Sequence, residues 1–93
     1  MHVTKRDIED QKLLKKILNR YGISFEIGYK RVEFYLPGRF LFEDAHPICY
    51  EIAFKYKMRR SRNTRGFINE DFVLNPIMCT SDRTLCMFMR RCK

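Results

Sequence analysis

Residues 48–58 constrain the fold more than any other segment, because they decide whether the second half of the chain begins with a helix or a strand. As a helix, the segment would carry apolar side chains nearly all round. As a strand, it alternates between two faces, one of them holding the apolar and aromatic side chains Ile48, Tyr50, Ile52, Phe54, Tyr56 and Met58. β-Branched and aromatic residues also suit a pleated surface. We therefore predict a strand over 48–58, with Pro47 just before it.

A helix is predicted at each end of the chain. Thr4 is a suitable N-cap for the first helix, and Gly22 supplies its stop. Between them, apolar residues recur on one arc of the helical wheel, namely Leu13, Leu14, Ile17, Leu18 and Tyr21. The second helix is predicted to begin at the N-cap Ser81, with an apolar stripe of Leu85, Phe88, Met89 and Cys92. Both helices can therefore bury one face against a sheet.

Three further segments complete the predicted sheet. Residues 23–27 and 32–36 alternate apolar and polar side chains on either side of a turn, which predicts a hairpin. Residues 67–74 then form the strand that returns beside 48–58. The predicted fold class is an α+β two-layer sandwich in a single domain, residues 1–93. Its antiparallel four-stranded sheet is flanked by N- and C-terminal helices, in the order α-β-β-β-β-α.

A basic run lies at the tip of the long hairpin that this fold would contain. Six basic residues occur there with no acidic residue among them: Lys55, Lys57, Arg59, Arg60, Arg62 and Arg65. The whole chain has 19 Lys and Arg against 11 Asp and Glu, a formal net charge of +8. A surplus of this size favours an anionic partner. Nucleic acid is the first candidate, because cations set against phosphates release condensed counterions.

The first predicted helix adds a second basic surface. Lys12, Lys15 and Lys16 lie on the arc opposite its apolar stripe and extend the contact made by the basic run. Tyr35, which its parity places on the open face of the predicted sheet, could stack on a base. These patterns predict a small, non-catalytic, RNA-binding regulatory protein that needs no cofactor. RNA is preferred to DNA because no helix-turn-helix spacing is present.

Two other functions fit the sequence. A compact basic domain could be a phage-type inhibitor or antitoxin-like protein that covers an acidic surface of a host protein. The second alternative function is that of a small endoribonuclease. Its candidate acid–base or metal-binding groups lie around one turn: Glu33, Glu43, Asp44 and His46. Metal ligands of another kind are offered by His46, Cys49, Cys79 and Cys86. Without a Cys-x-x-Cys pair, buried thiols explain the cysteines, and we expect no metal.

The sequence also predicts where the protein acts. No run approaches the roughly 18 consecutive apolar residues of a membrane span. The N-terminus lacks the apolar stretch of a secretory signal. We therefore expect a cytoplasmic protein, in the host cytoplasm if the chain is viral, with reduced cysteines and no membrane partner.

Overall fold

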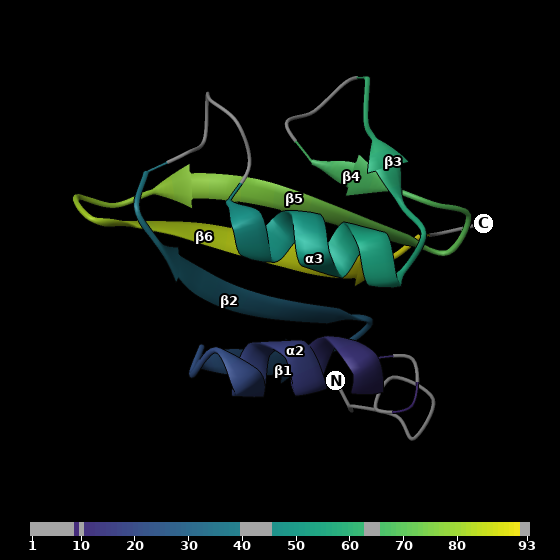
Figure 1. Cartoon of the computed structure of the whole chain (residues 1–93), viewed down its shortest axis with the longest axis horizontal. Coiled ribbons are helices and arrows are strands. Elements are labelled where there is room, and N and C mark those ends of the chain that lie inside the picture. The colour runs from purple at the N-terminus through teal and green to yellow at the C-terminus, as the bar shows by residue number, and fades with distance from the viewer. Residues whose placement is uncertain (1–8, 10, 40–45, 63–65, 92–93) are drawn as a thin grey trace.

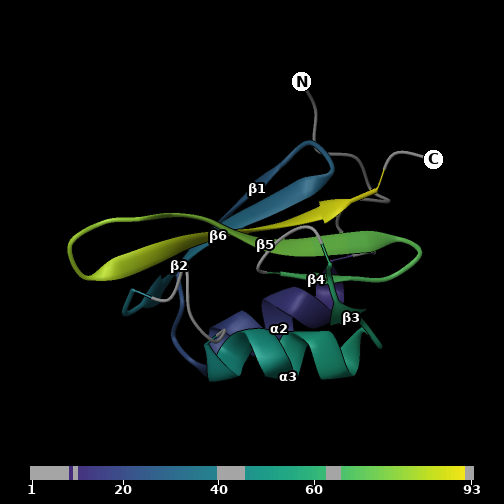
Figure 2. The same ribbon diagram turned by 90° about the horizontal axis from the view of Figure 1, so that it is seen from above.

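The structure is a computed structural model that describes residues 9, 11–39, 46–62 and 66–91 of the chain. These residues form a six-stranded antiparallel sheet and two helices (Figure 1). The strand order is β1-β2-β6-β5-β4-β3. Seen from above, both helices lie on the same side of the sheet (Figure 2). The molecule therefore has a helical side and an open side.

The helices are α2 (Lys12–Arg20) and α3 (Pro47–Lys55). The strands, in chain order, are β1 (Phe25–Gly28), β2 (Arg31–Pro37), β3 (Arg59–Arg60), β4 (Phe67–Ile68), β5 (Phe72–Cys79) and β6 (Arg83–Arg90). The predicted hairpin is present as β1 and β2, whereas the predicted return strand over 67–74 is divided between β4 and β5. The described first helix is shorter than predicted, because α2 begins at Lys12 after the N-cap Gln11, and the predicted N-cap Thr4 lies outside the described residues. Neither described helix has the length and apolar character needed to cross a membrane.

The predicted strand over 48–58 is wrong, because this segment contains helix α3 and the turn after it. His46 caps the helix, since its Nδ1 accepts a hydrogen bond from the Ile48 N–H at 3.1 Å. Pro47 occupies the first turn, where its missing N–H costs no hydrogen bond. The side chains buried beneath the helix are Ile48, Cys49, Ile52 and Ala53. They form one helical face, and the apolar residues left on the outside produced the apparent alternation.

The predicted C-terminal helix from Ser81 is also wrong, because residues 83–90 form strand β6 inside the sheet. Its fully buried side chains alternate along the strand: Thr84, Cys86 and Phe88. Because β6 also carries apolar residues on its other face, Leu85, Phe88 and Met89 match helical spacing. The described elements run α-β-β-α-β-β-β-β instead of α-β-β-β-β-α, and their sheet has six strands instead of four.

The core lies between the sheet and the two helices. Aromatic rings fill part of it, with Phe72 stacked on Phe88 at 4.8 Å between ring centroids. Tyr56, just after α3, contacts the same cluster, its centroid 4.8 Å from that of Phe88. The Tyr56 hydroxyl accepts a hydrogen bond from the Leu14 N–H at 2.9 Å. Since Leu14 belongs to α2, this bond holds α2 beside the end of α3.

Candidate nucleic-acid interface

The basic run does not form the tip of a long hairpin. Lys55 ends α3, Lys57 occupies a turn with a positive φ of 55°, and Arg59–Arg60 form the edge strand β3. Arg62 follows β3, and Arg65 lies outside the described residues. The long hairpin predicted to present the run is therefore replaced, among the described residues, by helix α3 and the two-residue strands β3 and β4. Its basic residues are divided between the end of a helix and the edge of the sheet.

A groove between α2 and α3 brings basic residues of both helices together. Lys16 and Arg20 of α2 and Lys55 of α3 line a cavity of about 600 Å³. A second hollow of about 640 Å³ continues along α2, and its lining includes Lys12, Lys15 and Lys16. The three lysines predicted on the first helix therefore share one surface with Lys55 of the basic run.

Two aromatic side chains lie on the outside of α3. Tyr50 and Phe54 are one helical turn apart and remain exposed. Phe54 is 78% exposed, more than any other large apolar side chain among the described residues, and Tyr50 is 46% exposed. Neither residue is among the contacts predicted from the sequence. The i, i+4 spacing sets them on one face of a helix, and the sequence prediction for 48–58 is a strand. That spacing, once the helix is recognised, is the signal that identifies them.

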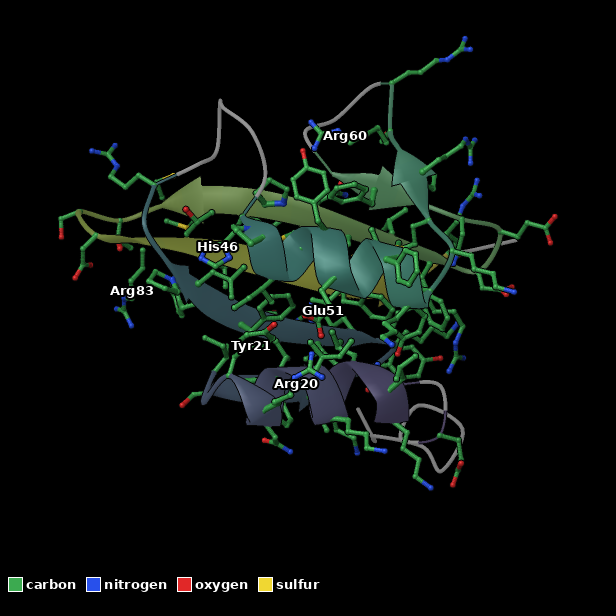
Figure 3. All side chains as sticks on the ribbon, viewed as in Figure 1. Arg20, Tyr21, His46, Glu51, Arg60 and Arg83 are labelled. Atoms are coloured by element: carbon green, nitrogen blue, oxygen red, sulfur yellow. The ribbon has the colours of Figure 1, made fainter. Side chains whose placement is uncertain are left out.

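Arg60 connects the basic run to this aromatic pair. Strand pairing sets Arg60 opposite Phe67, a core residue of the helical side. The guanidinium carbon of Arg60, which is labelled in Figure 3, lies 5.0 Å from the Phe67 ring centroid. Phe67 in turn packs edge-on against Tyr50, with 5.3 Å between the ring centroids. Arg59 pairs with Ile68 and faces the open side instead. We refer to one set of helical-side residues as the basic–aromatic face: Lys12, Lys15, Lys16, Tyr50, Phe54, Lys55 and Arg60.

Glu51, between the two helices, is already engaged. It forms an ion pair with Arg20 and accepts a hydrogen bond from the Tyr21 hydroxyl at 2.5 Å (Figure 3). These contacts tie α2 to α3 and use the negative charge of Glu51 within the protein. In the part of the chain that the structure describes, no acidic side chain forms an ion pair with any cation of the basic–aromatic face. Glu9 lines the same hollow as Lys12, Lys15 and Lys16, so the described face has five cations and one nearby carboxylate that forms no ion pair with them.

Tyr35 lies apart from these residues. It belongs to β2 and is 39% exposed on the open side, where its parity predicts it. The guanidinium carbon of Arg83 lies 4.5 Å from its ring centroid and occupies one face of the ring. The structure thus brings the predicted Lys12, Lys15 and Lys16 together with part of the basic run, and places Tyr35 on the other side of the sheet.

Of the groups considered for acid–base chemistry, the two that the structure describes, His46 and Glu33, lie on different sides of the sheet. His46 caps α3, and burial lowers the pKa of its imidazole below the ordinary value. Glu33 forms an ion pair with Arg31 at 3.1 Å on the open side. Glu43 and Asp44 lie outside the described residues.

The cysteines of the described chain are free thiols. Cys49 and Cys86 are buried in the core, where a hydrogen bond with Cys49 and then burial raise the pKa of the Cys86 thiol strongly. A buried thiol of raised pKa is a poor metal ligand and a poor nucleophile, because both roles need the thiolate. Among the residues with described positions, no three His, Cys, Asp or Glu side chains are grouped to hold a metal ion.

The arrangement suits a polyanion that also presents flat apolar groups. Lysines and Arg60 can contact phosphates, and the exposed rings of Tyr50 and Phe54 can stack on bases. Comparison with known protein families, with curated proteins and with solved structures found no match.

Proposed function

We propose that the protein binds nucleic acid, RNA in preference to DNA, as a non-catalytic regulator. The observation that carries this proposal is Phe54, which stands 78% exposed on α3 beside Lys55, with the lysine-lined groove along one side. An exposed ring near an excess of cations is the combination that suits single-stranded nucleic acids, because the cations contact the backbone and the ring offers a flat surface for a base. RNA is favoured because its loops present unpaired bases.

The proposed contact has two energetic parts. Each phosphate neutralised on a single strand lowers the slope of log K against log salt by about 0.7, so five cations predict a slope of about −3.5. Stacking of a base on Phe54 or Tyr50 adds about 1–3 kcal/mol that salt does not screen. Affinity should therefore fall steeply with salt, while the stacking part persists.

The test is fluorescence anisotropy with a labelled single-stranded RNA, titrated from about 50 to 200 mM salt. The double variant Lys16→Ala/Lys55→Ala should flatten the salt slope by about 1.4, since two phosphate contacts are lost. Arg60→Ala should weaken binding more than Arg59→Ala, a matched control one residue away that faces the open side. RNA binding that none of these variants changes would contradict the proposal, as would the absence of binding at every salt concentration.

A further inference from the structure

The open side of the sheet carries a group of apolar side chains around one polar residue, Asn75, which pairs with Met87. Register places Met89 beside Val73, Val73 beside Ile68, and Leu85 beside Met78. With Met87 between Leu85 and Met89 on β6, six side chains from three adjacent strands make up the apolar open face: Ile68, Val73, Met78, Leu85, Met87 and Met89. Both described helices lie on the other side of the sheet (Figure 2). Groups of apolar side chains left outside the core on one face can mark interaction sites in folded proteins.

Charges at the two edges of the sheet have opposite signs. Glu26 of β1 lies opposite Glu33 of β2, a like-charge pair that is unfavourable without a counter-charge. Arg31 pairs with Glu33, whereas Glu26 is exposed and forms no ion pair within the described chain. At the opposite edge, Arg59 of β3 is exposed on the same side and also has no acidic partner among the described residues.

The strand order makes this pattern self-complementary. In the order β1-β2-β6-β5-β4-β3, the centre lies between β6 and β5, and the acidic and basic edges lie at opposite ends. A two-fold axis parallel to the strands at that centre sets β6 over β5 of a second copy and β1 over its β3. Glu26 lies in the row of Met87 and Asn75, and Arg59 lies in the row of Val73 and Ile68. The two charges of facing edges are therefore offset by two residues along the strands, an offset that a glutamate and an arginine side chain can span together. A two-fold axis perpendicular to the strands, in the plane between the two sheets, would instead set each edge strand over the same strand of the second copy and bring like charges together.

We propose that two copies of this chain associate through the apolar open face, with the acidic β1 edge of each over the basic β3 edge of the other. The result is a two-fold sandwich of two sheets, a packing in which side chains of both inner faces interdigitate. The inference is independent of nucleic-acid binding. If both hold, the dimer presents two basic–aromatic faces on opposite outer surfaces.

The test is sedimentation equilibrium of the full chain over a concentration range. The wild type should have the mass of two chains. Met87→Lys should have the mass of one chain with unchanged circular dichroism, because the lysine sets a charge in the interface and Met87 lies outside the buried core of the single chain. Glu26→Arg and Arg59→Glu should each raise the dimer dissociation constant about three- to tenfold, and the double charge reversal should restore it. A wild-type monomer at all concentrations would overturn the proposal, as would a dimer that Met87→Lys or the single reversals leave intact.

Discussion

The two sides of the sheet differ in what they leave exposed. On the helical side, α2 and α3 cover the core and present lysines and aromatic rings outward. On the open side, aliphatic side chains lie half-covered by their neighbours, and much of the charge is paired or set at the edges. The net charge of +8 is therefore not spread evenly. A polyanion and an apolar surface would each be recognised by a different side of the same sheet.

The largest expected difference between the sides is in stability. Phe88 and Met87 are neighbours on β6, but Phe88 is fully buried on the helical side and Met87 lies on the open side. Phe88→Ala should lower the free energy of unfolding by about 3–5 kcal/mol, because it leaves a cavity in the aromatic cluster. Met87→Ala should cost the monomer less than about 1.5 kcal/mol. Urea unfolding measures both, and equal losses would contradict the assignment of the two sides.

Close packing at the edge of the sheet gives the next largest effect. A Cβ atom added to Gly66 would lie 1.9 Å from the Leu74 carbonyl oxygen, so the backbone must move. We expect Gly66→Ala to cost about 1–3 kcal/mol and to displace β3, with loss of the Arg60 contact. Gly22→Ala is the matched control, because its added Cβ meets nothing within 4 Å and only the positive φ of 69° is unfavourable. Thermal unfolding compares the stability of the two variants. A smaller loss of stability for Gly66→Ala than for Gly22→Ala would contradict the close packing of Gly66 against Leu74.

The next prediction is that RNA affinity depends on the aromatic pair of the helical side, Tyr50 and Phe54, and not on exposed rings elsewhere. Phe54→Ala should weaken binding of single-stranded RNA by about 1–3 kcal/mol, because a stacking surface is lost. Tyr29→Ala, which removes an exposed ring from the β1–β2 turn, should have little effect and serves as the control. Anisotropy at fixed salt is the measurement. Equal losses in the two variants would show that ring position does not matter.

The smallest expected effect is the dependence of stability on pH, through His46 at the start of α3. Burial lowers the pKa of His46, so the unfolded chain binds the proton more readily than the folded one. Stability from this residue is present above the ordinary value of 6.5 and is lost as pH falls from there toward the folded pKa. His46→Asn retains a capping side chain and should flatten the pH dependence of urea unfolding in that window. If the stability of His46→Asn depended on pH as steeply as that of the wild type, His46 would not be the group responsible.

The elements that the sequence pattern predicts correctly are those with one buried and one exposed face. α2 and the β1–β2 hairpin follow this rule, so their periods of 3.6 and 2 are clear. α3 and β6 carry apolar residues on both faces, so the spacing of their apolar residues does not distinguish a helix from a strand. For α3, the cap formed by His46 and Pro47 is the better indicator.

The candidate site was predictable in composition but not in arrangement. The lysines of α2 and the basic run are visible in the sequence, whereas the groove that brings Lys16 of α2 together with Lys55 of the run is visible only in the structure. Tyr50 and Phe54 could not be selected, because their common exposure depends on α3 being a helix. Arg59 and Arg60 are indistinguishable in sequence, and only the pairing of β3 with β4 assigns them to different sides.

The central claim is that RNA lies on the basic–aromatic face. Ultraviolet cross-linking of bound RNA, followed by mass spectrometry of tryptic peptides, tests it most directly. Arg39 separates Tyr35 from Tyr50 and Phe54, so trypsin places the open-side ring and the helical-side rings in different peptides. We expect nucleotide adducts on the peptide that contains Tyr50 and Phe54. Adducts confined to the peptide that contains Tyr35 would contradict the account.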